Sequence, residues 1–171
     1  MQIGPKYKIA RRLGAPVFEK TQTAKYTLSL SRKERVGKKG FTRPKSEFGQ
    51  ALTEKQKARF SYGLSERQFQ GYVKKAAKAA NPAQKLFQFL ETRLDNVLFR
   101  SGLAKSRAAG RQMASHGHTL VNGRRVTVPS IELKVGNTVS LRVGSAGSPL
   151  FGEATERMKA LTAPSWLAAD A

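Results

Sequence analysis

Between residues 93 and 124, basic and polar side chains are spaced as an RNA-binding surface requires. Arg107 and Arg111 lie four residues apart after a helix cap at Ser106, so they project from one helix face. Arginine pairs bidentately with phosphate and stacks on bases, so this set favours RNA contact over catalysis. The candidate RNA contacts in this segment are Arg93, Arg107, Arg111, Gln112, Ser115, His116, His118, Asn122 and Arg124.

The first half of the chain adds cations and interleaved aromatic side chains. Tyr62, which precedes Gly63 in a break between two predicted helices, is placed to stack on an unpaired base. Core packing is the better interpretation of Phe48 and Phe60. The candidate RNA contacts in this half are Lys6, Lys8, Arg11, Arg12, Arg43, Lys45, Lys55, Lys57, Arg59, Tyr62, Arg67 and Gln68.

The charge of the chain predicts a polyanionic partner. The 171 residues include 32 Lys and Arg against 11 Asp and Glu, a net charge of +21. Cations that neutralise phosphates release condensed counterions and thereby favour binding. Residues 1–82 hold 20 basic and 5 acidic side chains, and residues 83–171 hold 12 and 6. The first half is therefore expected to provide most of the electrostatic attraction.

The sequence lacks the residues of an enzyme or a metal site. The only two histidines, His116 and His118, have no Asp, Glu or Cys close by to complete a metal site, and cysteine is absent. Asp95 is expected to orient a neighbouring basic side chain. We expect no catalysis, cofactor, metal or small-molecule substrate. No long apolar run or signal peptide is present, so we expect no membrane association.

The elements that must position these residues are predicted from caps and periodicity. Residues 1–50 read as irregular, with one short helix at 6–13. Capping boxes at Thr53 and Ser65 predict helices over 53–61 and 66–80, and further helices are expected at 83–100, at 106–115 after Ser106, and at 153–161. Alternating β-branched runs at 120–128, 131–133 and 138–143 predict a small antiparallel sheet.

The predicted fold class is α+β. A helical first domain with a basic, irregular N-terminal arm precedes a domain in which two helices pack on the small sheet. The expected boundaries are 1–50 for the arm, 51–82 for the helical part of the first domain, and 83–145 for the RNA-binding domain. Residues 146–171 are expected to form a linker, a short helix and a segment that returns to the first domain.

Four stretches carry a family resemblance. RLDNVLFRSGLAKSRAAGRQMASHGHTLVNG, residues 93–123, resembles the S-four RNA-binding domain. GPKYKIARRLG, YGLSERQFQGYVKKA and PSWLAAD are similar, in the same order, to the bacterial and organellar family of small-subunit ribosomal protein four. The resemblance covers nearly the whole chain, whereas the RNA-binding domain alone is shared by several RNA enzymes.

The resemblance implies a structural protein of the small ribosomal subunit. Members bind a multi-helix junction in the 5′ domain of small-subunit rRNA early in assembly, beside ribosomal protein five and near the mRNA entrance. By this analogy Lys6, Arg11 and Arg12 belong to an arm on rRNA, and Arg43 and Lys45 to a loop nearest the mRNA. Tyr62, Gln68 and residues 93–124 form the two halves of the rRNA contact. The implied location is the ribosome of the cytoplasm, with an organellar matrix as the alternative.

The sequence departs from the family pattern in two places. The stretch 21–40 lacks the Cys and His that hold zinc in some members, so no such site is expected. The chain also stops shortly after PSWLAAD, where many members continue, which suggests a short form from a reduced ribosome. A free-standing RNA chaperone or translational repressor remains the alternative, because only the RNA partner separates the two. An RNA-modifying enzyme or tRNA synthetase would need a catalytic domain for which 171 residues leave no room, and a non-specific DNA-binding protein is a weaker reading.

Overall fold

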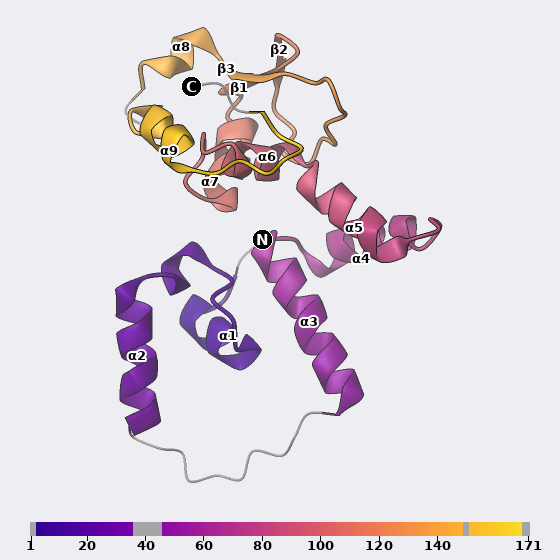
Figure 1. Cartoon of the computed structure of the whole chain (residues 1–171), viewed down its shortest axis with the longest axis vertical. Helices are drawn as coiled ribbons and strands as arrows, with labels where there is room; N and C mark the ends of the chain where they lie inside the picture. The colour runs from indigo at the N-terminus through magenta and orange to yellow at the C-terminus, as the bar shows by residue number, and fades with distance from the viewer. Residues whose placement is uncertain (1–2, 36–45, 149–150, 169–171) are drawn as a thin grey trace. The chain divides into compact units, whose positions relative to one another are not determined.

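The computed structural model describes residues 3–35, 46–148 and 151–168. The chain divides into two compact units, residues 1–69 and residues 70–171. Helices dominate both units, and a three-stranded antiparallel sheet lies in the second (Figure 1). The predicted α+β class is therefore confirmed.

The first unit builds helices around a small aromatic core. Its elements are α1 (Lys6–Leu13), the short 3-10 helix η1 (Glu19–Thr21), α2 (Ala24–Arg35) and α3 (Glu47–Ser61). Buried Ala10, Phe18 and Tyr26 form the core, and Leu30 and Phe60 pack against it. The helix at 6–13 was predicted correctly. The prediction that the rest of residues 1–50 is irregular was wrong for 24–35.

The missed helix α2 is explained by tertiary packing. Tyr26 and Leu30 lie four residues apart on one face of α2 and pack with Phe18 and Ala10. The rest of α2 is polar apart from Ala24 and exposed Leu28, so its sequence shows weak periodicity. Most of the stability of such a helix comes from the packing of its one apolar face.

The start of α3 lies earlier than predicted. Ser46 caps the helix, because its hydroxyl accepts a hydrogen bond of 3.2 Å from the Gly49 amide. Thr53 is no cap: it lies inside the helix, where its hydroxyl donates to the Gly49 carbonyl at 2.7 Å. The capping box at Ser65 is confirmed, since Gln68 Oε1 accepts from the Ser65 amide at 3.1 Å and Ser65 Oγ accepts from the Gln68 amide at 3.2 Å. The helix that it opens, α4 (Glu66–Ala76), ends four residues before the predicted Ala80.

The predicted single helix at 83–100 is wrong, because the structure breaks it in two. The parts are α5 (Pro82–Glu91) and α6 (Leu94–Arg100). At the break the Leu94 amide donates to the Ile131 carbonyl at 3.0 Å, and the Leu133 amide donates to the Thr92 carbonyl at 2.8 Å. The segment 131–133, predicted as a strand of the sheet, instead bridges this break.

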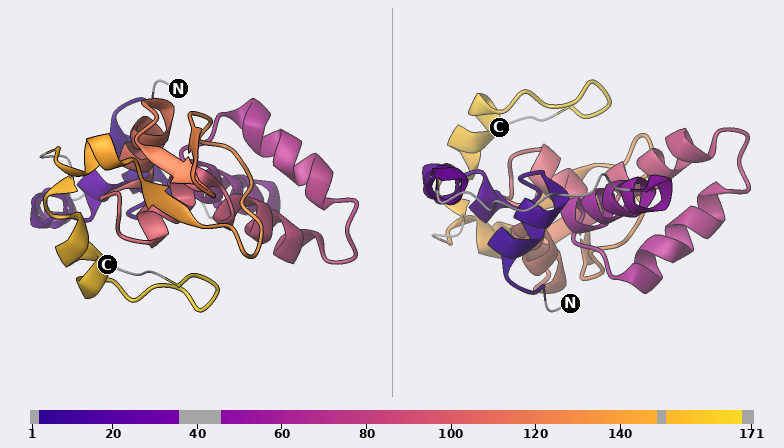
Figure 2. Two further views of the ribbon diagram at one scale, coloured as in Figure 1. Left: turned by 90° about the horizontal axis from the view of Figure 1, so that it is seen from above. Right: turned by 90° about the horizontal axis from the view of Figure 1, so that it is seen from below.

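The sheet and α7 complete the second unit. Helix α7 (Arg107–Ser115) begins at the predicted Ser106 cap. Strand β1 (Thr119–Val121) lies between β2 (Arg124–Val126) and β3 (Val139–Leu141), and both pairs are antiparallel. Asn122 and Gly123 have φ values of 50° and 75° and form the two-residue turn of the β1–β2 hairpin. Figure 2 shows the strands over α6 and α7.

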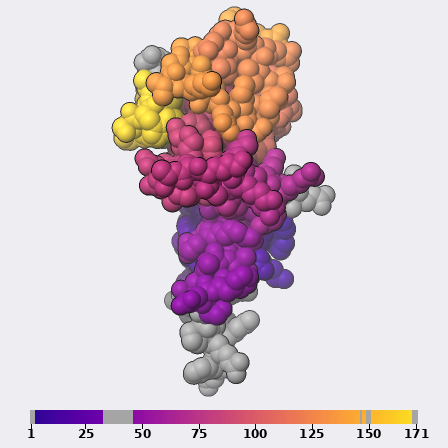
Figure 3. Space-filling view, turned by 90° about the vertical axis from the view of Figure 1, so that its right-hand side faces the viewer, coloured from indigo at the N-terminus to yellow at the C-terminus, as the bar shows by residue number. Residues whose placement is uncertain are grey.

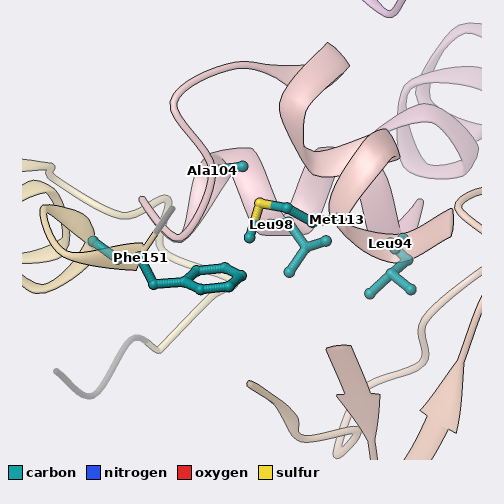
Figure 4. Packing of buried hydrophobic residues seen from close by; sticks show 7 residues of the cluster. Leu94, Leu98, Ala104, Met113 and Phe151 are labelled. Atoms are coloured by element: carbon teal, nitrogen blue, oxygen red, sulfur yellow. The ribbon is translucent and has the colours of Figure 1, made fainter. Parts of the chain in front are cut away.

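The core of the second unit joins α6, α7, the sheet and the C-terminal segment. Its buried members are Leu94, Leu98, Ala104, Met113, Ala114, Phe151 and Ala154. Phe151 points toward Met113 and Leu98 (Figure 4). Residues 146–171 were predicted as a linker that returns to the first domain. Two of them, Phe151 and Ala154, lie in this core instead.

Two short helices belong to the C-terminal segment. They are α8 (Val143–Ala146), which was not predicted, and α9 (Ala154–Ala160), close to the predicted bounds. Arg157 of α9 donates to the carbonyls of Gly102 and Leu103 at 3.3 and 3.4 Å. Figure 3 shows this segment, in yellow, against the surface of the same unit.

Gly110 tests the close packing of α6 on α7. A Cβ atom at this position would lie 2.5 Å from the Asp95 carbonyl oxygen, which belongs to the backbone and has no room to yield. We expect Gly110→Ala to lower the free energy of unfolding by about 1–3 kcal/mol through overpacking, measured by urea denaturation. Gly71→Ala is the matched control, because Gly71 lies in α4 with nothing within 4 Å of the added Cβ. It should raise stability by about 0.5–1 kcal/mol, and equal effects at both sites would contradict the packing argument.

Candidate nucleic-acid interface

Arg93 is a buried structural residue. It is 2% exposed, and its Nε and Nη2 donate to the Asp95 carboxylate at 3.0 and 2.8 Å. Its Nη1 donates to the Tyr72 hydroxyl at 2.6 Å. Burial alone would lower the pKa of Arg93, but the hydrogen bond and the charge of Asp95 raise it above its ordinary value. The prediction that Arg93 contacts RNA is therefore wrong, because its guanidinium lies inside the protein.

Asp95 orients a second arginine, as the sequence predicted. The Nη2 and Nε atoms of Arg111 lie 2.8 and 3.0 Å from Asp95 Oδ2. The Asp95 side chain is 2% exposed and that of Arg111 is 34% exposed. One buried carboxylate thus fixes one buried guanidinium and one at the surface.

Glu91 orients two further arginines in the same way. Its carboxylate accepts from Arg100 Nε and Nη2, both at 2.9 Å, and lies 4.0 Å from Arg107 Nη2. Arg107 Nε also donates to Asn96 Oδ1 at 2.7 Å, and Asn96 in turn donates to Glu91. Its guanidinium lies 4.7 Å from the centre of the Phe99 ring. Both Arg107 and Arg111 are therefore held in place by buried side chains.

The resulting surface carries a surplus of positive charge. We call Arg100, Arg107 and Arg111 the arginine cluster; their side chains are 34%, 22% and 34% exposed. With buried Arg93, four guanidinium groups surround two carboxylates, so an anion at the exposed side meets net positive charge. Two acids therefore hold all four arginines.

Arg100 was missed by the sequence analysis. It lies nine residues after Glu91, a spacing that does not match one helix face. The break between α5 and α6 brings the two together. Only the tertiary structure reveals this pair.

The C-terminal end of α7 carries the remaining polar candidates. Gln112, Ser115 and His116 are exposed, as a rim of the predicted face requires. His118 is partly buried: its Nδ1 lies 3.0 Å from Ser145 Oγ, and its ring meets the Phe151 ring edge-on at 5.8 Å between centres. His118 therefore holds the C-terminal segment on the core. Among the described residues, no cluster of His, Cys, Asp and Glu suits a metal ion.

The β1–β2 hairpin carries two exposed cations, Arg124 and Arg125. Arg124 follows the turn and is exposed. Arg125 donates to the His116 carbonyl at 3.3 Å. The side-chain oxygen Oδ1 of Asn122 accepts a hydrogen bond of 2.8 Å from the Thr138 amide. The Asn122 side chain therefore fixes the loop before β3.

The basic candidates of the first unit lie mostly at its surface. On α1, the exposed candidates are Lys6, Lys8 and Arg12. Arg11 is partly buried, and its Nε donates a hydrogen bond of 3.1 Å to the Tyr7 carbonyl. Arg67 is exposed as well, and Tyr62 is partly buried at the end of α3. The predicted contacts Arg43 and Lys45 lie outside the described residues.

Two lysines of α3 form surface ion pairs. Lys55 lies 2.6 Å from Glu66, and Lys57 lies 2.7 Å from Glu54. The pKa of Glu66 is lowered, chiefly by the hydrogen bond from Lys55. Exposed pairs of this kind contribute little to stability, so an RNA phosphate can compete for the lysines.

One prediction about aromatic residues was wrong. Phe48, assigned to the core, is 78% exposed. Phe60, assigned likewise, does pack there, with its ring edge-on to Phe18 at 5.8 Å between centres. Because α3 starts at Glu47, Phe48 lies in its first turn, beyond the reach of this core.

The fold and the charge define a protein with an RNA-binding S4 domain. Residues 92–139 match the model of the S4 domain, and residues 2–91 match the model of the ribosomal protein S4/S9 N-terminal domain. The small ribosomal subunit protein uS4 of Methylobacillus flagellatus is 42% identical over 168 residues, which are 96% of this chain and 80% of the relative.

Two further relatives carry the same name. The protein of Heliobacterium modesticaldum is 41% identical over 98% of this chain and 82% of its own length, and that of Natranaerobius thermophilus is 43% identical over the same shares. The chain belongs to the uS4 family of small ribosomal subunit proteins. Within the described ranges, no helix has the length and apolarity needed to cross a bilayer.

Asp95 is the residue on which the arrangement of Arg93 and Arg111 depends. Asp95→Asn keeps the shape but removes the negative charge and leaves Arg93 buried without a counter-ion. We expect the free energy of unfolding to fall by about 3–5 kcal/mol, measured by urea denaturation. Glu66→Gln, which removes a carboxylate from an exposed pair, should cost less than about 1 kcal/mol. A loss for Asp95→Asn as small as that of the control would show that the buried pair is not structural.

Proposed function

We propose that this chain is a structural constituent of the small ribosomal subunit that binds rRNA, with the arginine cluster as a principal contact. The observation that carries this proposal is the pair of buried carboxylates, Glu91 and Asp95, that hold three partly exposed arginines on one unit. Membership of the uS4 family supports the same function.

The cluster is suited to phosphate because its arginines are already oriented. An unrestrained arginine loses side-chain entropy when it binds, whereas Arg107 and Arg111 have lost much of it within the folded protein. Arginine donates in a planar fork that matches a phosphate, and the surplus charge attracts one. Exposed Arg124 and the rim residues Gln112, Ser115 and His116 extend this contact.

The finer part of the proposal concerns the RNA target. The chain binds a helical junction in the 5′ domain of small-subunit rRNA as a primary binder and nucleates assembly there. Proteins recognise RNA helices through their phosphates, 2′-hydroxyls and shape. Arginines and a hairpin suit this kind of recognition better than they suit hydrogen bonding to base edges. The exposed cations of α1 and the lysines of α3 give a second contact from the first unit.

The proposed position in the subunit follows from the family. Ribosomal protein five and the mRNA entrance are the expected neighbours, and Arg43 and Lys45 the residues nearest the mRNA. The relatives are named as ribosomal proteins, so we propose a non-enzymatic role without cofactor or small-molecule substrate. The cytoplasm is the proposed compartment.

Double replacement of Arg107 and Arg111 by Ala tests the arginine cluster. We expect weaker binding to a 5′-domain rRNA transcript, in the presence of excess tRNA, with a flatter dependence of affinity on salt. The logarithmic slope should flatten by up to about 1.8, the equivalent of two phosphates. Arg107→Lys with Arg111→Lys should keep most of the salt dependence, because lysine keeps the positive charge. It should still bind RNA more weakly, because lysine lacks the planar guanidinium that donates two hydrogen bonds to a phosphate.

A charge-matched control separates this contact from general attraction. Lys134 and Lys159 are exposed cations of the second unit outside the candidate surface. Their double replacement by Ala removes the same charge and should leave the slope nearly unchanged. Unfolding curves check that each variant is folded. Equal slopes for wild type and the arginine double variant would place the arginine cluster away from RNA.

A further inference from the structure

A surface groove lies between α1 and α2 of the first unit. It has a volume of about 520 Å³ and is lined by Tyr7 of α1 and by Lys25, Leu28, Ser29 and Arg32 of α2. Both helices are drawn in indigo to purple in Figure 1. None of the α2 residues was among the candidates predicted from the sequence.

The four α2 residues form one stripe along the helix. Their spacings of three, four and seven residues place them on the same face. Lys25 and Arg32 are separated by about 10 Å along the axis, from a rise of about 1.5 Å per residue. Leu28 lies between them, so the groove has a cation at each end and an apolar side chain in the middle.

Leu28, the apolar side chain of α2 in the groove, is not part of the core. Tyr26 and Leu30 supply the core face of α2, whereas Leu28 is 59% exposed. Tyr7 is fixed beneath the groove, because its ring packs on buried Tyr26 with 5.2 Å between the ring centres. A flat apolar ligand would cover Leu28 and the accessible part of Tyr7 without any change in the core.

Among the described residues, no acidic side chain forms an ion pair with Lys25 or Arg32. In the described part of the first unit, the ion pairs join Lys55, Lys57 and Arg59 to acids, and none involves Lys25 or Arg32. A ligand with negative charge at both ends and an apolar middle would complement the groove. An unpaired nucleotide within an RNA strand has this chemistry, since its base has an apolar face and its two flanking phosphates are anionic.

We propose that this groove binds an unpaired nucleotide of the rRNA, with its base on Leu28 and Tyr7 and its flanking phosphates on Lys25 and Arg32. The proposal rests on the proposed function, which supplies the RNA. Paired bases are excluded, because their faces are stacked within the helix and do not reach the groove. A protein partner fits less well, since residues 1–82 hold 20 basic against 5 acidic side chains and favour a polyanion.

Two variants of the full chain separate the base contact from the phosphate contacts. Leu28→Ser should weaken binding to the 5′-domain transcript about tenfold at unchanged salt slope, because it removes apolar contact with the base. Lys25→Ala with Arg32→Ala should instead flatten the slope by about 1.4, the value for two phosphates on a single strand. Both changes are at surface positions outside the core cluster, so the unfolding curves should match that of the wild type. Lys74→Ala with Lys78→Ala, a pair of exposed cations elsewhere, serves as the charge-matched control.

The absence of cysteine makes the RNA partner of the groove directly identifiable. Ser31→Cys gives a single thiol on an exposed position of α2 beside the groove, and a tethered iron chelate there cleaves nearby RNA. We expect cleavage around one nucleotide. In free RNA, this nucleotide should react with chemical probes for unpaired bases, and in the complex it should be protected from them. Cleavage confined to paired RNA, or no cleavage, would overturn the inference.

The outcomes also separate the two proposals. Wild-type binding that neither groove variant alters would overturn the groove and leave the proposed function intact. A wild type that does not bind the transcript overturns both. A flatter slope for Lys25→Ala with Arg32→Ala, without an effect of Leu28→Ser, would show that the groove contacts phosphates only and would overturn the nucleotide pocket.

Discussion

Two buried carboxylates support the RNA-binding surface of a strongly basic chain. Asp95 and Glu91 are 2% and 3% exposed, in a protein that has only 11 acidic residues for 32 basic ones. Asp95 accepts hydrogen bonds from Arg93 and Arg111, and Glu91 accepts hydrogen bonds from Arg100 and lies 4.0 Å from Arg107. Without them, the guanidinium groups on α6 and α7 would repel one another and would lack a fixed direction. The acids therefore contribute to binding by placing the cations, although neither is expected to touch RNA.

The break between α5 and α6 makes this pairing possible. In one continuous helix, Glu91 and Arg100 would lie on different faces, and Arg93 could not turn inward. The bonds that Leu94 and Thr92 make with residues 131 and 133 replace the helical bonds lost at the break. Gly110 lets α7 approach the Asp95 backbone closely enough for Arg111 to reach the carboxylate. Backbone, packing and charge thus depend on one another at this point.

The first unit also has an excess of cations, but it presents them differently. Its core is small and aromatic, with Phe18 and Tyr26 at the centre, and its lysines and arginines lie mostly at the surface. Their few ion pairs are exposed and weak, so attraction to a polyanion is retained. The second unit offers preoriented arginines, and the first offers charge together with exposed apolar side chains such as Leu28. The proposed contacts of the two units therefore differ in kind.

The sequence by itself determined what depends on neighbours along the chain. The charge, the caps at Ser65 and Ser106, the Asn122-Gly123 turn and the shared face of Arg107 and Arg111 follow from local spacing. Tertiary structure alone decided the helix break, the burial of Arg93, the role of Arg100, the helix α2 and the exposure of Phe48. The reason is physical: each of these depends on a partner distant in sequence, and hydrogen bonds or apolar contacts with that partner outweigh local preference.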